Sequence, residues 1–151
     1  MRVVLGSDHA GYELKEELKG VLSGLGHEIL DVGTNSTDPA DYPDYAEALA
    51  AELKEGRADR GVLICGSGVG ASVAANKIPG IRAGLCHDTY SAHQSVEHDN
   101  VNVLVMGARI IGSELAREIL RAFLAARYTA EERHRRRLDK VLEIERRYGK
   151  P

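Results

Sequence analysis

The sequence is short of the residues on which several classes of protein depend. Among its 151 residues there are two cysteines, one phenylalanine and no tryptophan. Two cysteines exclude a scaffold held by several disulfides, and so few large aromatic rings argue against a platform that stacks nucleic-acid bases. No run approaches the about 20 apolar residues of a membrane-spanning helix. The net charge of −3 gives no reason to expect a nucleic-acid or membrane partner.

The beginning of the chain lacks the pattern of an export signal. The segment MRVVLGSDHAGYELK reaches acidic residues after only a few apolar ones. We therefore expect a cytoplasmic protein with both thiols reduced. Charge is uneven along the chain, because residues 127–151 hold nine Lys and Arg against five Asp and Glu, whereas residues 1–126 hold eleven against eighteen. A basic tail thus follows an acidic body.

What the sequence does contain is a regular alternation of two patterns. Short apolar, β-branched runs occupy residues 3–5, 29–32, 61–65, 81–86 and 101–106. Segments of helical character follow at residues 11–25, 44–55, 69–77, 89–97 and 113–128. Strand and helix repeated five times predict a five-stranded parallel sheet with helices on both faces. We expect an α/β, Rossmann-like, three-layer α/β/α fold, and a single domain over residues 1–151.

The basic tail predicts one further helix, over residues 129–148. Thr129 stands where an N-cap would, with Glu132 three residues later as in a capping box. Leu138, Val141 and Leu142 give this helix only a narrow apolar stripe. A helix that is so polar cannot close a core alone, so we expect it to pack on another surface, such as that of a partner subunit.

A glycine-rich turn follows the third predicted strand. Residues 66–70 read Gly-Ser-Gly-Val-Gly, and such a turn before a helix aims backbone N–H groups at an anion. It lacks the spacing of a phosphate-binding P-loop and of the dinucleotide fingerprint. The alternative is a tight turn that needs glycine for packing alone. Cys65 precedes the turn, where a helix N-terminus lowers the pKa of a thiol and lets it act as base or nucleophile.

Other polar residues fall at the same predicted edge or in the tail. Asp8 and His9 follow the first strand, and Asp8 could equally cap the helix after it. Cys86 is more simply explained by packing. The histidines at 87, 93 and 98 are spaced by six and five residues, which does not suit a metal on one helix face, so we expect no metal. Arg133 and Arg137 are one helical turn apart and could grip a phosphate.

Taken together, these motifs resemble those of the type B ribose-5-phosphate isomerases, a family shared with the galactose-6-phosphate isomerase subunits. The matching segments are GSDHAGYELK near the start, DVGT at 31–34, DYP at 41–43, CGSGVG at 65–70, AANKIPGIRA at 74–83, NVLVMGARIIG at 102–112 and RHRRR at 133–137. The resemblance implies reversible conversion of ribose 5-phosphate and ribulose 5-phosphate without metal or other cofactor. It also implies homodimers or homotetramers whose sites lie at the subunit interface.

The resemblance assigns a role to each residue of the expected site. Cys65 would be the base that moves a proton between the first two sugar carbons, His98 would open the furanose ring, and Asp8 would bind sugar hydroxyls. Ser67 would bond the reacting oxygens, beside an anion hole and pocket wall made by Gly66, Gly68, Val69, Gly70, Asp99, Asn100 and Tyr42. The phosphate would be held by His9, Arg109, Arg133 and Arg137.

One position departs from the family pattern. The residue after the ring-opening histidine is usually Asn, but here it is Asp99, followed by Asn100. A carboxylate would repel an enediolate, so either Asn100 substitutes or the preference for substrate shifts. Two other functions stay open: an isomerase that prefers an aldohexose 6-phosphate such as allose 6-phosphate, and a non-catalytic module that binds a nucleotide or flavin. Galactose-6-phosphate isomerase activity is less favoured, because that activity needs two different subunits.

Overall fold

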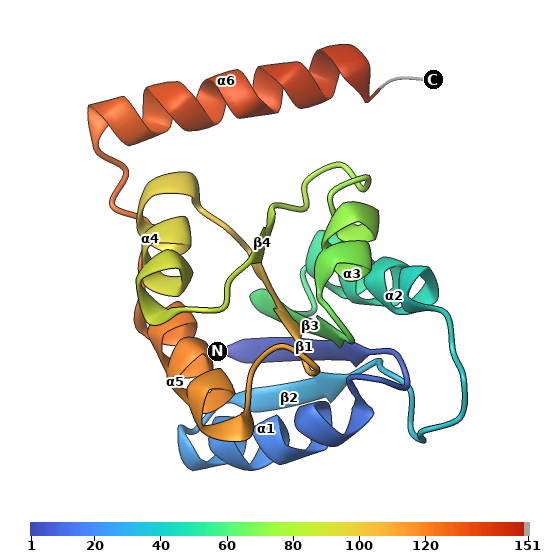
Figure 1. The fold of residues 1–151 in the computed structure, drawn as a ribbon. Helices are drawn as coiled ribbons and strands as arrows, with labels where there is room; N and C mark the ends of the chain where they lie inside the picture. The colour runs from blue at the N-terminus through green and yellow to red at the C-terminus, as the bar shows by residue number, and fades with distance from the viewer. Residues whose placement is uncertain (150–151) are drawn as a thin grey trace.

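The expected alternation of strands and helices is present in the structure, a computed structural model that describes residues 1–149 (Figure 1). Residues 150 and 151, which the predicted domain included, lie outside the described part. The described chain forms β1 (Arg2–Ser7), α1 (Tyr12–Gly24), β2 (Glu28–Asp31), α2 (Tyr42–Lys54), β3 (Arg60–Cys65), α3 (Val69–Ala75), β4 (Ala83–Leu85), α4 (Thr89–Asp99), β5 (Val103–Gly107), α5 (Ser113–Ala125) and α6 (Glu132–Tyr148). The α/β fold class is confirmed.

The five strands form one parallel sheet in the order β2-β1-β3-β5-β4. The chain therefore reverses direction twice across the sheet, once after β2 and again after β4. Because crossovers between parallel strands are right-handed, each reversal moves the connecting helix to the other face. Helices α1, α4 and α5 cover one face and α2 and α3 the other, which gives three layers.

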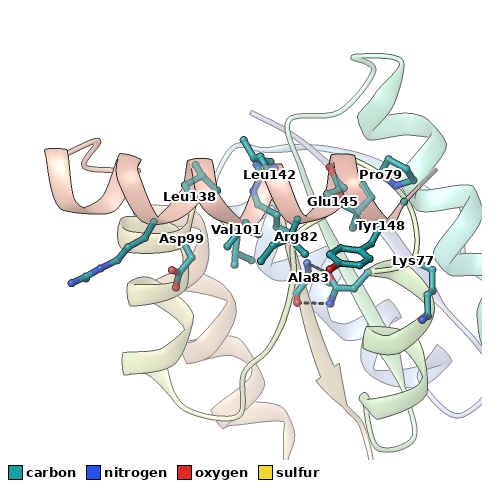
Figure 2. Close-up of a pocket in the computed structure, with 16 residues that line it drawn as sticks. Lys77, Pro79, Arg82, Ala83, Asp99, Val101, Leu138, Leu142, Glu145 and Tyr148 are labelled. Atoms are coloured by element: carbon teal, nitrogen blue, oxygen red, sulfur yellow. Dashed lines mark hydrogen bonds between the residues drawn. The ribbon is translucent and has the colours of Figure 1, made fainter.

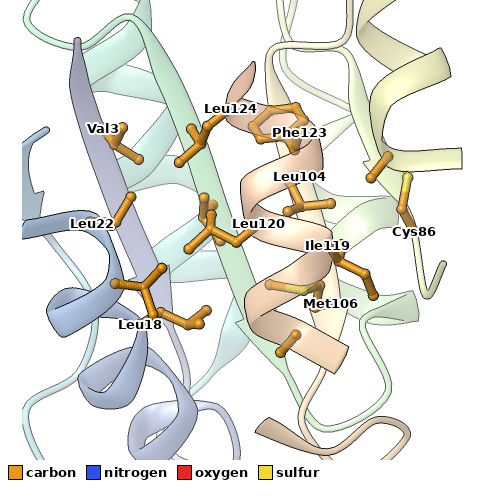
Figure 3. Close-up of a cluster of buried hydrophobic side chains, with 14 of the residues drawn as sticks. Val3, Leu18, Leu22, Cys86, Leu104, Met106, Ile119, Leu120, Phe123 and Leu124 are labelled. Carbon is orange, nitrogen blue, oxygen red and sulfur yellow. The ribbon is translucent and has the colours of Figure 1, made fainter. Parts of the chain in front are cut away.

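Both faces of the central strands are buried, as their continuous apolar runs predict. Successive side chains alternate between the faces, so that Val62 and Ile64 pack under α1 and α5 while Leu63 and Cys65 pack under α2 and α3. Figure 3 shows the first cluster, in which Leu18 of α1 and Leu120 and Phe123 of α5 lie over the sheet. Cys65 thus has its backbone fixed in the core.

The segments GSDHAGYELK and DVGT are joined by a partly buried ion-pair network. Lys15 of α1, fully buried, donates to Asp31 Oδ2 at 2.6 Å and to Glu16 Oε1 at 3.1 Å. Burial alone would raise the pKa of Asp31, but hydrogen bonds from Lys15, Lys19 and the Gly33 N–H outweigh it and lower that pKa. This network fastens α1 to the end of β2.

Helix ends differ from the sequence prediction for identifiable reasons. Helix α5 ends at Ala125 rather than at residue 128, because the Arg60 guanidinium donates to the carbonyls of Phe123 at 2.5 Å and Ala126 at 2.6 Å. The prediction that Thr129 caps the last helix is wrong. Helix α6 begins at Glu132, and the Thr129 hydroxyl donates instead to the carbonyl of Glu97 in α4.

Helix α6 lies outside the three layers and contacts α4 (Figure 1). Its length of 17 residues and its exposed polar side chains agree with the predicted polar final helix. No helix among residues 1–149 combines the length and apolar character needed to cross a bilayer.

Candidate active site

The carboxyl ends of β1, β3 and β5 lie side by side and gather ten of the predicted site residues. The sheet register pairs Ser7 with Ile64 and Cys65 with Gly107. The segments that follow these strands therefore begin at one edge of the sheet, the usual place for a ligand in an open α/β fold. We call this group the thiol cluster; it comprises Asp8, His9, Tyr42, Cys65, Gly66, Ser67, Gly68, Val69, Gly70 and Arg109.

The Cys65 sulfur faces the glycine-rich turn. The residue is 4% exposed, and its Sγ accepts a hydrogen bond from the Gly68 N–H at 3.1 Å. Gly68 has φ +81° and ends the turn directly before α3. A Cβ at this position would lie 2.5 Å from Leu85 Cδ1 as well as in a strained backbone conformation. Glycine at 68 is therefore required for the amide to reach the thiol.

Two side chains lie over the other glycines of the turn. A Cβ at Gly70 would come within 2.6 Å of the Tyr42 ring, and one at Gly66 within 3.2 Å of the Arg109 guanidinium. The Ser67 hydroxyl accepts from the Val69 N–H at 3.2 Å. The turn thus carries a thiol, a hydroxyl and several backbone amides, with a phenol ring and a cation beside them.

Asp8 and His9 are held by local backbone contacts. Asp8 is 6% exposed, and its Oδ1 accepts from the Gly11 N–H at 3.1 Å. Gly11 is the N-cap of α1, so Asp8 holds the turn before the helix, and the interpretation of Asp8 as the cap itself is wrong. The Ala40 N–H lies 3.1 Å from His9 Nδ1. The Ala40 carbonyl oxygen lies 3.2 Å from the same Nδ1. The His9 ring is thus anchored to Ala40 through Nδ1.

Cys86 and His87, which follow β4, have structural roles. Burial raises the pKa of the Cys86 thiol, which agrees with the packing interpretation. His87 accepts the Gly107 N–H on Nε2 at 2.9 Å and so fastens the end of β5. Sequence reasoning gave His87 no role. Within the described residues, no three His, Cys, Asp or Glu side chains form a group that could hold a metal ion.

The remaining five predicted residues gather at the opposite end of the sheet. Helix α4 runs back along the strands, so its last turn and Asn100 lie where β5 begins, whereas Cys65 lies where β5 ends. The five residues of β5 span about 15 Å. We call this second group the imidazole cluster; it comprises His98, Asp99, Asn100, Arg133 and Arg137. One chain therefore does not bring the two clusters together.

The imidazole cluster is organised around His134, which sequence reasoning missed. The His98 and His134 rings stack with centroids 4.1 Å apart and planes 26° apart. The Arg133 Nε donates to His134 Nε2 at 3.2 Å. A signal for this residue was present, because His134 continues the apolar stripe of α6 one turn before Leu138.

A cavity of about 610 Å³ lies beside this cluster, between α6 and the segment that leads into β4 (Figure 2). Asp99 and Arg137 lie on its wall, with Arg82 and Glu145. Figure 2 shows Leu138 and Leu142 of α6 on the other side of the space from Arg82 and Val101. Asn100, in a left-handed conformation with φ 50°, ends α4, and its carbonyl accepts from Arg82 Nε at 2.7 Å.

Comparisons with known proteins find relatives over nearly the whole chain. A model of the Ribose/Galactose Isomerase family matches residues 3–141. Ribose-5-phosphate isomerase B of Escherichia coli (strain K12) is 44% identical over 146 residues, covering 97% of each chain. D-erythrulose-4-phosphate isomerase of Pectobacterium atrosepticum is 41% identical over 129 residues, covering 85% of each chain.

The fold agrees equally well with a solved structure. Ribose-5-phosphate isomerase B of Clostridium thermocellum superposes with a TM-score of 0.95 at 44% identity, covering 98% of this chain and 99% of that chain. The resemblance inferred from the motifs is therefore confirmed over nearly the whole length. The chain belongs to the Ribose/Galactose Isomerase family.

Proposed function

We propose that this sugar-phosphate isomerase interconverts ribose 5-phosphate and ribulose 5-phosphate through an enediolate, with Cys65 as the base. The observation that carries the proposal is the Cys65 sulfur facing the glycine-rich turn at the carboxyl edge of the sheet, 3.1 Å from the Gly68 nitrogen. The Gly68 amide donates to the sulfur and holds it toward the turn, and the thiolate is the form able to accept a proton. Family membership favours catalysis over a non-catalytic flavin or nucleotide module.

The chemistry needs one base and one site for negative charge. As a thiolate, Cys65 takes the proton from C2 of the open-chain aldose, and the electrons of that C–H bond form the enediolate. The O2 hydroxyl proton passes to O1, and the resulting thiol returns its own proton to C1, which gives the ketose. Backbone amides of residues 66–70 and the Ser67 hydroxyl stabilise the oxygens as charge develops, and Asp8 binds sugar hydroxyls.

We propose further that the working site needs two copies of the chain. The thiol cluster and the imidazole cluster lie at opposite ends of β5, so a sugar phosphate bound at Cys65 meets His98, Arg133 and Arg137 only from a second copy. This supports a homodimer, or a homotetramer built from such dimers. His9 and Arg109 would then hold the phosphate from the first copy, and Tyr42 would line the pocket.

Exposed apolar side chains supply surface for such an association. Val69 and Val73 on α3 are 54% and 57% exposed, next to the thiol cluster. Val141 and Ile144 of α6 are about half exposed and line the 610 Å³ cavity next to the imidazole cluster. Docking one pair against the other would bury both pairs and join the two clusters. Residues 1–151 would then act as one isomerase domain with α6 packed on the partner.

The chemistry at Asp99 follows from the same arrangement. Asp99 is exposed at the end of α4, and Asn100 follows it. We propose that the Asn100 amide takes the donor role toward the enediolate and that the Asp99 carboxylate points away from it.

For location we propose the cytoplasm, since both cysteines are free thiols that suit a reducing compartment.

A second substrate class has specific support. The Pectobacterium relative carries the name D-erythrulose-4-phosphate isomerase at 41% identity. Four-carbon phosphates are therefore a candidate alongside pentose and aldohexose phosphates.

Purified protein would be assayed by a coupled reaction on ribose 5-phosphate, erythrose 4-phosphate, allose 6-phosphate and free ribose. We expect the highest kcat/KM for ribose 5-phosphate; a higher value for another sugar would reassign the substrate, and turnover of none would reject the function.

A mixing experiment tests the two-copy site. Cys65→Ala and Arg137→Ala chains would be unfolded together, refolded and assayed at a KM-limited concentration of ribose 5-phosphate. If the site is shared, random pairing gives heterodimers with one intact site each, so about a quarter of wild-type activity returns. Activity no greater than the mean of the two separate variants would show that each chain supplies a complete site.

A further inference from the structure

The proposed mechanism leaves the buried imidazole of His134 unused. His134 is 2% exposed, although it belongs to a run of exposed basic residues at the start of α6. Histidine is a costly residue to bury unless both ring nitrogens have partners. The partners of His134 therefore indicate what the residue does.

Hydrogen bonding assigns one neutral form to the His134 ring. The Thr129 hydroxyl donates its only proton to the Glu97 carbonyl at 3.1 Å, and its oxygen lies 2.7 Å from His134 Nδ1. Nδ1 must therefore be the donor to that oxygen. The Arg133 Nε–H points at Nε2 from 3.2 Å, so Nε2 is the acceptor. If Nε2 gained a proton, two N–H donors, those of His134 and Arg133, would face each other and repel.

The charged surroundings act in the same direction. Burial lowers the pKa of His134, and the charge that His98 carries when protonated and the charges of Arg133 and Arg137 lower it further, whereas Glu131 raises it. His98 faces the ring from α4, and the other three groups face it from α6 and the residue before it. The ring therefore stays uncharged at neutral pH.

The same ring holds two groups of the proposed site. Its face stacks on His98, whose Nδ1 lies 2.9 Å from the Gln94 amide nitrogen. With the amide as donor to Nδ1, His98 keeps Nε2 for proton transfer. The edge of His134 meanwhile holds Arg133, whose Nη2 also lies 3.2 Å from Glu131. The two groups are thus fixed by different parts of one residue.

We propose that His134 is a positioning residue that stays neutral and fixes His98 through its ring face and Arg133 through Nε2. This inference rests on the proposed function, because it takes His98 as the ring-opening group and Arg133 as a phosphate ligand. It adds that ring opening and phosphate binding share one support. The His134 ring also helps to place the start of α6 at Glu132, because Thr129, just before the helix, links this ring to α4.

Two substitutions separate the two contacts. His134→Phe keeps an aromatic face for His98 but has no atom to accept from Arg133. His134→Gln keeps polar atoms near Thr129 and Arg133 but has no ring to stack. His93→Gln, a change on α4 away from the His98 ring, serves as the matched control. Circular dichroism and thermal unfolding would establish that each variant is folded before assay.

Two substrates separate ring opening from the later steps. Ribose 5-phosphate must open a furanose ring, whereas erythrose 4-phosphate cannot form one because its C4 oxygen carries the phosphate. We expect His134→Gln to lower kcat about 10-fold to 100-fold for ribose 5-phosphate and less than about 3-fold for erythrose 4-phosphate. We expect His134→Phe to raise KM about 10-fold for both sugars, with a smaller change in kcat.

A proportional loss of the same size for both sugars in both variants would mean a general packing role and would overturn the proposal. So would wild-type kinetics in both variants. A readout independent of turnover is the nitrogen-15 NMR spectrum of the histidine rings. We expect the neutral Nδ1–H form of His134 to persist to lower pH than that of an ordinary histidine, whose pKa is about 6.5. Titration of His134 with an ordinary midpoint would overturn the proposal, whereas a wild-type enzyme inactive on both sugars would reject only the proposed function.

Discussion

The two ends of the sheet are built by different means. At the carboxyl end, the thiol cluster is fixed by strand ends and by glycines that allow close backbone approach, such as Gly68 beside Leu85. At the amino end, the imidazole cluster is fixed by side chains that contact one another across α4 and α6, such as His98 on His134. The first construction is rigid by backbone geometry, and the second depends on a few replaceable contacts.

The difference indicates how the proposed work is divided. The step that moves a proton between carbons needs a base and amides held within a few tenths of an ångström, which backbone packing provides. Binding a phosphate tolerates looser positioning, because arginine side chains can adjust. We therefore expect substitutions of Cys65 and of its turn to reduce kcat, and those of Arg133 and Arg137 to raise KM.

The largest expected effect is that of Cys65→Ala. Removing the base should lower kcat at least about 1,000-fold for ribose 5-phosphate and leave KM within a few-fold, since no phosphate contact is lost. Cys86→Ala is the matched control, because Cys86 is the other buried thiol and its contacts are those of packing. Turnover by Cys65→Ala close to wild type would remove Cys65 from the role of base.

Next comes Gly68→Ala, which tests the backbone construction itself. The added methyl would lie 2.5 Å from Leu85 Cδ1 at a φ of +81°, so the turn must move away from the Cys65 sulfur. We expect kcat to fall about 100-fold. Gly20→Ala adds the same methyl at an exposed position of α1, where no other atom lies within 4 Å of the added Cβ. That control should keep full activity, and its free energy of unfolding should rise by about 0.5–1 kcal/mol.

A smaller effect is expected at the opposite end. Arg137→Ala should raise KM about 10-fold to 100-fold for ribose 5-phosphate and much less for free ribose, because one charge-assisted contact to the phosphate is lost. Arg136→Ala removes a neighbouring arginine that pairs with Glu132 on the exposed face at 2.7 Å, and its KM should stay near wild type. Equal KM changes for the two sugars in Arg137→Ala would exclude a phosphate contact.

The smallest effect is a dependence of stability on pH. The pKa of His134 is lowered from its usual 6.5, so between the two values the unfolded chain binds a proton that the folded chain does not. The free energy of unfolding should therefore fall as pH drops below about 6.5. Urea unfolding at pH 7.5 and pH 5.5 would measure the fall, which should be smaller in His134→Gln. The same fall in both proteins would show that His134 protonates freely when folded.

The fold followed from the sequence because its pattern is regular. Apolar runs at residues 61–65 and 101–106 predicted strands buried on two sides, and they became the central strands β3 and β5. Boundaries were missed where a distant side chain decides them. The end of α5 depends on Arg60, 63 residues away from Phe123, and no local pattern near residue 125 carries that information.

The site was predictable to different degrees at its two ends. Residues that follow adjacent parallel strands must meet, so Asp8, Cys65 and Arg109 could be grouped from the sequence alone. The grouping of His98 with Arg133 required the path of α4 and α6, which only the structure gives. The separation of Cys65 from His98 within one chain follows from the direction of α4, and motif matching carries no such direction.

The position of β5 between β3 and β4 has a consequence for how the protein is made. Strand β4 pairs with β5 alone among the described strands, and β5 is the last strand to leave the ribosome. Until residue 107 emerges, the nascent chain holds β4 without a neighbour and β3 with an open edge, the kind of exposed strand that promotes aggregation. Completion of the sheet is thus postponed until synthesis has passed residue 107.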